Sequence, residues 1–262
     1  MEIVPGLRSV RLLGSRSYLV VEDEITLIDA GLRGSGTLLR RYLDGLGRSP
    51  RDVKRIVCTH GHPDHIGGVR EIAAMTGAEV LMHEADVQRL RMSVRDALRE
   101  LRPWAFVAAV TRGPEDAKPL ADGAILPALG GLEVVHTPGH TPGSVCLYSR
   151  AHELLIVGDV LQVIGGRVSL PSLVFTEDMA LARRSIARMA ELDVRTICFA
   201  HYPTWREGGG EAIRALAERE RATSGSHPAD PSGSAGTPGT AARSESANPE
   251  RASGRRPRDQ AG

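Results

Sequence analysis

Short hydrophobic runs recur near the beginning of the chain, and residues that favour turns follow each of them. The runs cover positions 10–13, 17–21 and 25–29 and are separated by Gly-Ser and by Glu-Asp-Glu. Apolar runs of this length, interrupted by turn residues, are typical of strands that pair with their neighbours in sequence. The pattern therefore predicts an antiparallel meander at the start of the fold.

Helical periodicity follows the meander. Leu39, Leu43 and Leu46 recur at helical spacing, and Gly47 supplies a stop signal after them. Further along, the expected order is a strand at 56–58, a helix from 68 to about 76 and a strand at 78–82. The order strand, helix, strand indicates sheets that are covered by helices.

The second half of the chain shows the same alternation. Strand-like runs cover 124–126, 132–135, 144–148, 154–158 and 196–200, and helices are expected from about 178 to 190 and from 210 to 221. Between the halves, positions 84–110 carry apolar residues at helical spacing and the densest aromatic patch of the chain, around Trp104 and Phe106. Two helices inserted between strands are expected there.

The composition changes abruptly after Arg221. Positions 222–262 contain no Leu, Ile, Val, Met, Phe, Trp or Tyr, only small, polar and charged residues together with proline. Such a segment has no apolar surface whose burial could offset the entropy lost on ordering. We therefore expect one folded domain over residues 1–221 and a disordered low-complexity tail over 222–262.

Charge and composition exclude several classes of partner. The chain has 33 basic and 32 acidic residues and a net charge of +1, so binding to nucleic acid or to anionic membranes is not expected. Its first residues lack the pattern of a secretory signal, and no window is long and apolar enough to span a bilayer. These features predict a cytoplasmic protein without a polyanionic partner. Cys58, Cys146 and Cys198 lie in apolar runs and are expected to be buried hydrophobic residues without a chemical role.

The candidate chemistry is concentrated in one stretch, Thr-His-Gly-His-Pro-Asp-His-Ile-Gly-Gly, which begins at Thr59. His60, His62, Asp64 and His65 follow directly on the apolar run 56–58. A strand that ends in such a loop places imidazoles and a carboxylate at the edge of a sheet. Zinc and similar metals bind these nitrogen and oxygen donors well, so the stretch predicts a metal site.

The spacing His60-x-His62-x-Asp64-His65 resembles the signature of the metallo-β-lactamase-fold hydrolases. Three further pieces of that pattern occur in the right order: His140 in His-Thr-Pro-Gly-His-Thr-Pro-Gly-Ser, Asp159 after Leu-Leu-Ile-Val-Gly, and His201 after Thr-Ile-Cys-Phe-Ala. The resemblance covers residues 1–221. It implies an α+β fold, the four-layer αβ/βα sandwich, with the helical insertion near 84–110 either lying over the metal site or packing on the outer layer.

The resemblance also implies a division of labour among the candidate ligands. His60, His62 and His140 would bind one divalent ion, Asp64, His65 and His201 would bind a second, and Asp159 would bridge the two. Zinc is the metal expected, with iron or manganese as alternatives, and Asp64 and Asp159 are the residues assigned catalytic roles. In similar proteins an aspartate at the position of Asp29 holds the metal loop from behind, whereas the residues alone allow a turn or capping aspartate.

The implied reaction is hydrolysis of a small ester, thioester or lactone, with a hydroxide shared by the two ions attacking the carbonyl carbon. The commonest metallo-β-lactamases have a cysteine where this chain has Asp159, which disfavours antibiotic hydrolysis as the main activity. Two alternatives stay open, an iron-dependent persulfide dioxygenase of the same fold and a non-catalytic metal-binding regulatory module. One departure from the family is Tyr202, because similar proteins often have glycine after the last histidine.

Overall fold

A computed structural model describes residues 1–90 and 117–225 of the chain. Within these residues the first sheet has seven strands in the order β1-β2-β3-β4-β5-β6-β7. Its strands are β1 (Glu2–Val4), β2 (Leu7–Arg11), β3 (Arg16–Val21), β4 (Ile25–Ile28), β5 (Val53–Cys58), β6 (Glu79–Met82) and β7 (Lys118–Pro119). Strands β1 to β4 pair antiparallel, which confirms the predicted meander, and β4 to β7 pair parallel.

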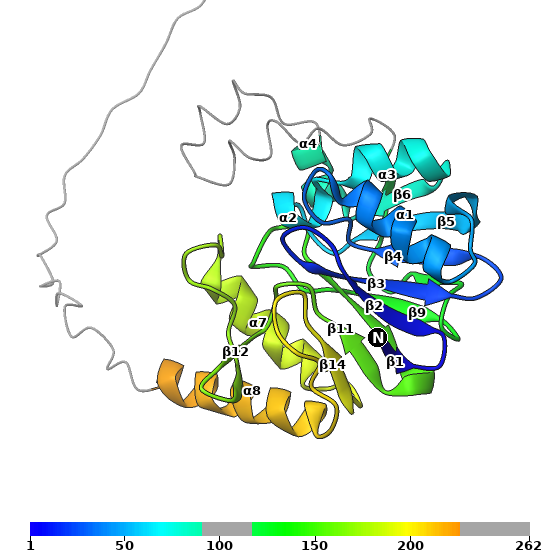
Figure 1. Cartoon of the computed structure of the whole chain (residues 1–262). Coiled ribbons are helices and arrows are strands. Elements are labelled where there is room, and N and C mark those ends of the chain that lie inside the picture. The colour runs from blue at the N-terminus through cyan, green and yellow to red at the C-terminus, as the bar shows by residue number, and fades with distance from the viewer. Residues whose placement is uncertain (91–116, 226–262) are drawn as a thin grey trace, which may run out of the picture. The chain divides into compact units, whose positions relative to one another are not determined.

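Helices cover the outer face of this sheet (Figure 1). They are α1 (Ser35–Gly45), α2 (Pro63–Ile66), α3 (Val69–Thr76) and α4 (Glu84–Leu90), with a short 3-10 helix, η1 (Pro50–Asp52), before β5. Leu39 and Leu43 of α1 and Ile72 of α3 are fully buried in one cluster with Ile56 of β5. The apolar positions at helical spacing therefore form the face that α1 packs against the sheet.

The second sheet has the order β14-β11-β10-β9-β8 within the described residues. Its strands are β8 (Ile125–Leu126), β9 (Leu132–His136), β10 (Val145–Ser149), β11 (Leu154–Ile156) and β14 (Thr196–Cys198), and a turn of 3-10 helix, η2 (Arg150–His152), joins β10 to β11. Helices α7 (Met179–Met189) and α8 (Gly209–Gly225) cover its outer face, as Figure 1 shows. Ile186 and Ile213 of these helices are fully buried in a cluster that includes Leu155 of β11.

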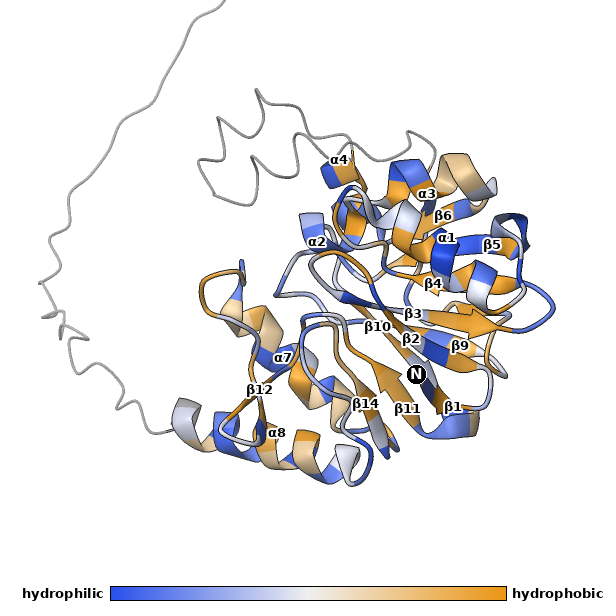
Figure 2. Cartoon of the chain, in the orientation of Figure 1, coloured by the Kyte–Doolittle hydropathy of each residue, from blue (hydrophilic) through white to orange (hydrophobic). Residues whose placement is uncertain are grey.

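The two sheets face each other across a shared apolar core. Tyr18 and Val57 from the first sheet lie in one buried cluster with Leu147 and Ile156 from the second. Figure 2 shows hydrophobic residues along the strands of both sheets, between the outer helices. The order helix, sheet, sheet, helix confirms the predicted four-layer αβ/βα sandwich.

The structure contains several elements that the sequence analysis did not predict, among them β1, β7 and a small hairpin. Strands β12 (Gln162–Ile164) and β13 (Arg167–Ser169) form a separate antiparallel hairpin. Its signal is present in the sequence, because Gly165-Gly166 separates two short apolar runs as in a two-residue hairpin loop. Helix α8 also continues to Gly225 rather than ending near Arg221.

Several predictions concern residues outside those that the structure describes. Of the helical insertion expected over 84–110, only α4 is described, so Trp104 and Phe106 lie outside the described residues, as does the segment 226–262. In residues 1–90 and 117–225, no helix combines the length and the hydrophobicity needed to cross a membrane.

Candidate metal centre

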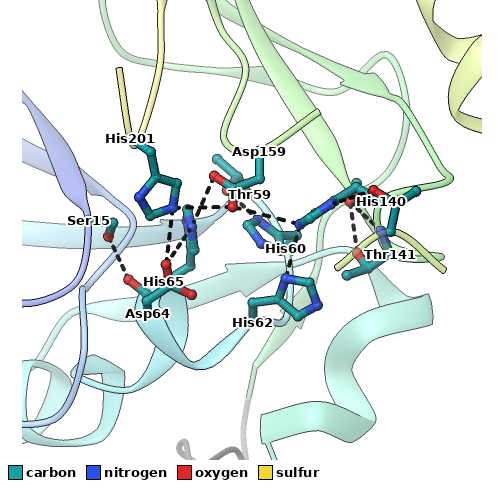
Figure 3. Close-up of polar contacts among 12 residues, drawn as sticks. Ser15, Thr59, His60, His62, Asp64, His65, His140, Thr141, Asp159 and His201 are labelled. Carbon is teal, nitrogen blue, oxygen red and sulfur yellow. Dashed lines mark hydrogen bonds and ion pairs between the residues drawn. The ribbon is translucent and has the colours of Figure 1, made fainter. Parts of the chain in front are cut away.

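All seven predicted ligands converge at one edge of the sandwich, where several strands end (Figure 3). β5 ends at Cys58 and leads into the loop and short helix α2 that carry the four ligands of the sequence motif. His140 lies in the loop between β9 and β10, Asp159 follows β11, and His201 follows β14. Residues separated by up to 141 positions are therefore brought together because their strands end at the same edge.

The first group of donors consists of His60, His62 and His140. One ligand atom from each lies within 4.8 Å of the others, and all three residues are buried. His140 Nε2 and His62 Nδ1 are 3.0 Å apart. Three imidazoles that converge in this way form a typical nitrogen site for a divalent metal.

The second group consists of Asp64, His65, Asp159 and His201, again with ligand atoms within 4.8 Å of one another. His201 Nε2 lies 3.1 Å from Asp64 Oδ2 and 3.2 Å from Asp159 Oδ2. His65 Nε2 lies 3.3 Å from Asp159 Oδ1. Asp159 Oδ2 is also 3.8 Å from His140 Nε2, so this carboxylate lies between the two groups.

Hydrogen bonds from behind direct the histidine rings toward the centre. Asp29 Oδ2 lies 2.8 Å from His65 Nδ1, and the same carboxylate accepts hydrogen bonds from the backbone and hydroxyl of Thr59. Thr59 Oγ1 in turn lies 3.2 Å from His60 Nδ1. Because the Nδ1 atoms are occupied, the Nε2 atoms of His60 and His65 face the other ligands. The expectation that Asp29 supports the metal loop agrees with these contacts.

Electrostatics keeps the first group neutral. Burial, followed by the repulsion of His65, lowers the pKa of His60 well below its ordinary value. Burial also lowers the pKa of His62 to about 3 and that of His140 to about 4. Neutral imidazoles at neutral pH have the free lone pairs that a metal requires.

The second group is an ionised cluster. Burial opposes the charge of Asp159, but His65 and a hydrogen bond from His201 outweigh it and hold the pKa of Asp159 well below its usual range. Hydrogen bonds to Asp159 and Asp64 raise the pKa of His201 to about 9. This group therefore presents two carboxylates, whose negative charge suits a divalent cation.

Buried polar atoms that lack hydrogen bonds test whether these residues fit a metal. Within the described residues, His60 Nε2, His65 Nε2 and Asp159 Oδ1 are buried and form no hydrogen bond of good geometry, and His65 Nε2 lies 3.3 Å from Asp159 Oδ1. Such atoms are costly in a native core unless another partner satisfies them. Their positions and chemistry fit divalent metal binding.

A buried aspartate that the sequence analysis missed joins the two metal loops. Asp86 of α4 is fully buried and accepts hydrogen bonds from the backbone of Gly61 at 2.8 Å and of Gly143 at 3.0 Å. It also accepts from Thr141 Oγ1 at 2.5 Å and from Arg89 Nε at 3.1 Å. Asp86 thus connects the loop of the sequence motif to the loop that carries His140.

Two glycines allow α4 to approach this closely. A Cβ atom on Gly61 would overlap Arg89 Cδ, and one on Gly143 would lie 2.7 Å from Asp86 Cβ. Glycine therefore serves here for close approach of the backbone rather than for a turn. The glycines flank the ligands in the sequence, but nothing in their spacing indicates which helix they contact.

The remaining histidines and cysteines of interest lie outside both groups. His83 and His136 stack on each other, with ring centroids 3.9 Å apart. The three cysteines are free and buried, in agreement with their expected role as small hydrophobic residues.

A cavity of about 620 Å³ opens onto the metal ligands. Its described lining combines five candidate ligands, drawn from both groups, with apolar and polar residues: Leu32, His62, Pro63, Asp64, His140, Gly158, Asp159, Leu161, Gln162, Ser172, Phe175, His201 and Tyr202. The site is therefore accessible to a small molecule, and Tyr202 lies on its wall with its hydroxyl 3.2 Å from Gln162 Oε1.

Relatives of this chain include proteins that are named as hydrolases. Two curated relatives are the probable metallo-hydrolase YqgX of Bacillus subtilis and the acyl-coenzyme A thioesterase MBLAC2 of Gallus gallus, each 32% identical. The matches cover 55% and 56% of this chain and 64% and 55% of the relatives, so the chain spans less than two thirds of either relative's length.

The fold and the sequence pattern lead to the same family. The crystal structure of a metallo-beta-lactamase family protein from Thermus thermophilus is similar, with a TM-score of 0.68 and 25% identity over 84% of this chain and 81% of that one. The sequence pattern of the metallo-beta-lactamase superfamily matches residues 10–201, which span all seven predicted ligands. This chain therefore belongs to the metallo-beta-lactamase superfamily.

Proposed function

We propose that the protein is a metal-dependent hydrolase of a small ester, thioester or lactone and that it uses two divalent ions, with zinc as the preferred metal. His60, His62 and His140 would hold one ion, and Asp64, His65 and His201 the other. The position of Asp159 between the two groups carries the proposal, because its carboxylate lies near His65 and His201 on one side and near His140 on the other. A carboxylate shared by two cations reduces their mutual repulsion.

Divalent ions in such a site polarise a carbonyl group and provide a nucleophile from water at neutral pH. The residues of this chain prepare the site for that chemistry. Burial keeps His60, His62 and His140 neutral, and the ionised carboxylates of Asp64 and Asp159 supply the negative charge. The backing contacts of Asp29 and Thr59 hold two of the rings in one orientation before substrate arrives.

The residues that line the cavity favour a small organic substrate. Leu32, Leu161 and Phe175 line it together with Gln162 and Tyr202, and no lysine or arginine is among its described lining residues. A phosphodiester substrate would require basic residues to bind its phosphates. An ester or thioester whose reacting end is uncharged matches this lining better, and one relative bears the name acyl-coenzyme A thioesterase.

Metal analysis combined with a substrate screen tests the proposal. The full chain, loaded with zinc, is expected to hydrolyse members of a panel of thioesters, esters and lactones and to leave phosphodiesters intact. Asp159→Asn should abolish this activity, whereas His152→Ala, on the 3-10 turn η2, should retain it. One iron per chain together with oxygen uptake on a persulfide would overturn the proposal in favour of a dioxygenase. Metal binding without turnover of any panel member would favour a non-catalytic module.

A further inference from the structure

A short turn beside the metal centre exposes three consecutive large hydrophobic residues. Leu173, Val174 and Phe175 are 79%, 83% and 51% exposed. The turn is closed by a hydrogen bond from the backbone of Thr176 to the carbonyl of Ser172, 3.0 Å long. The loop that leads into α7 is accordingly coloured as hydrophobic in Figure 2. Single exposed apolar residues are ordinary, but three in succession at the mouth of a cavity point to a binding surface.

The turn is attached to the metal centre. Thr176 Oγ1 lies 3.3 Å from His140 Nδ1. The backbone amides of Glu177 and Asp178 donate hydrogen bonds to the carbonyl of Gly139, at 3.2 Å and 2.9 Å. Phe175 is adjacent to these anchors and lines the cavity, so its position relative to His140 is fixed by the chain.

Two further apolar residues of the cavity lie beside candidate metal ligands. Leu32 and Asp64 are neighbours, since atoms of both lie within 3.0 Å of the position that a Cβ atom on Gly14 would occupy. Leu161 lies two positions after Asp159 and also lines the cavity. Leu32, Leu161 and Phe175 therefore form a set of apolar residues that extends from the reacting centre to the exposed turn. We call this set the apolar wall.

We propose that the apolar wall binds the acyl chain of an ester or thioester whose carbonyl group lies at the metal centre. The proposal rests on the hydrolase function proposed above and specifies the substrate as one with a medium or long acyl chain. Gln162 and Tyr202 line the cavity as well and offer polar groups to the other part of the substrate. The exposed turn extends the apolar surface beyond the cavity, which suits a chain longer than the cavity alone would bury.

Chain-length selectivity of the full, zinc-loaded protein tests the proposal. With p-nitrophenyl esters from acetyl to decanoyl, kcat/KM of the wild type is expected to rise with chain length. Phe175→Ala should lower kcat/KM for the decanoyl ester roughly ten-fold to a hundred-fold and that for the acetyl ester by less than about three-fold. The matched control is Ile164→Ala on β12, which removes a side chain that is 59% exposed and does not line the cavity.

A binding measurement separates this proposal from the proposed function. Decanoate should bind the wild type more tightly than acetate does, and Phe175→Ala should remove most of that difference. The acyl-chain proposal would be overturned, even if esters are hydrolysed, by equal affinities for decanoate and acetate. It would also be overturned if Ile164→Ala weakened decanoate binding as much as Phe175→Ala does. Tight decanoate binding without hydrolysis of any ester or thioester would instead overturn the proposed function. A third outcome would assign the turn to a lipid surface and contradict the proposal. In that case the protein would sediment with phosphatidylcholine vesicles, Leu173→Ala would abolish this sedimentation, and kcat/KM would not change with acyl chain length.

Discussion

Asp29 and His65 are joined by a hydrogen bond of 2.8 Å between the carboxylate Oδ2 and the imidazole Nδ1. Both side chains are buried, and the backbone of Asp29 has a φ of 60°, which few residues other than glycine, asparagine and aspartate adopt readily. The carboxylate fixes the tautomer of His65, so that Nε2 faces Asp159 at 3.3 Å. A residue that would not itself bind the metal thus sets the geometry of one that would.

Replacing Asp29 by asparagine should weaken the second metal position. Asparagine tolerates the left-handed backbone, but it lacks the charge that holds the protonated Nδ1 of His65. We expect Asp29→Asn to lower zinc affinity roughly ten-fold to a hundred-fold, measured by competition with a chromophoric chelator. Asp23→Asn, at an exposed position, is the matched control. Unchanged affinity in Asp29→Asn would show that the backing contact does not orient His65.

Removing the carboxylate of Asp86 should destabilise the fold as well as the site. Asp86→Ala removes the buried acceptor of the Gly61 and Gly143 amides and of Arg89 Nε, although Arg89 keeps its contact with Glu177. Breaking such a buried charge network costs about 3–5 kcal/mol. Chemical denaturation should therefore show a large fall in the free energy of unfolding, while Glu84→Ala in the exposed part of the same helical turn should change it by less than about 0.5 kcal/mol. Equal stability of the two variants would contradict the assigned role of Asp86.

Metal removal should make stability depend on pH on the alkaline side. In the metal-free protein, hydrogen bonds to Asp159 and Asp64 raise the pKa of His201 from 6.5 to about 9. A raised folded-state pKa means that protonated His201 stabilises the fold fully below pH 6.5, and that this contribution is lost as the pH rises through about 9. Thermal unfolding should show a falling Tm of the metal-free protein over this window.

Two comparisons check the origin of that dependence. Zinc-loaded protein should lack the fall in Tm, because a cation replaces the proton between His201 and the carboxylates. His201→Gln should reduce the fall even without metal, whereas His152→Ala should retain it in full. The remainder in His201→Gln is expected from His65, where burial lowers the pKa but the carboxylates of Asp159 and Asp29 outweigh it and raise the pKa. An undiminished fall in Tm in His201→Gln would contradict the role of His201.

Local patterns in the sequence were sufficient to predict most strands and helices and a metal site at residues 60–65, whereas the four-layer arrangement and the full set of candidate ligands followed from the family resemblance. Apolar runs with turn residues predict strands, and each ligand directly follows such a run or lies between two of them. Asp29 was recognised only through the family resemblance, since an aspartate before a glycine is equally typical of a turn.

Asp86 could not be predicted, because its importance depends on contacts with distant residues. An aspartate in the first turn of a helix is ordinarily solvent-exposed and favourable for the helix dipole. Only the fold brings it to Gly61, 25 residues away, and to Thr141, 55 residues away. The apolar turn at Phe175 was missed for a similar reason, since its meaning depends on its position beside His140. Trp104 and Phe106 of the expected insertion lie outside the described residues, whereas Leu32, Leu161 and Phe175 line the cavity.

In the proposed site, Asp159 belongs to two metal positions at once. Elemental analysis of zinc in the purified wild type and variants tests it most directly. We expect two ions per chain in the wild type, about one in His62→Ala and in His201→Ala, and weakened binding at both positions in Asp159→Asn, with two ions kept in His152→Ala. A single ion in the wild type, or two ions bound with unchanged affinity in Asp159→Asn, would contradict it.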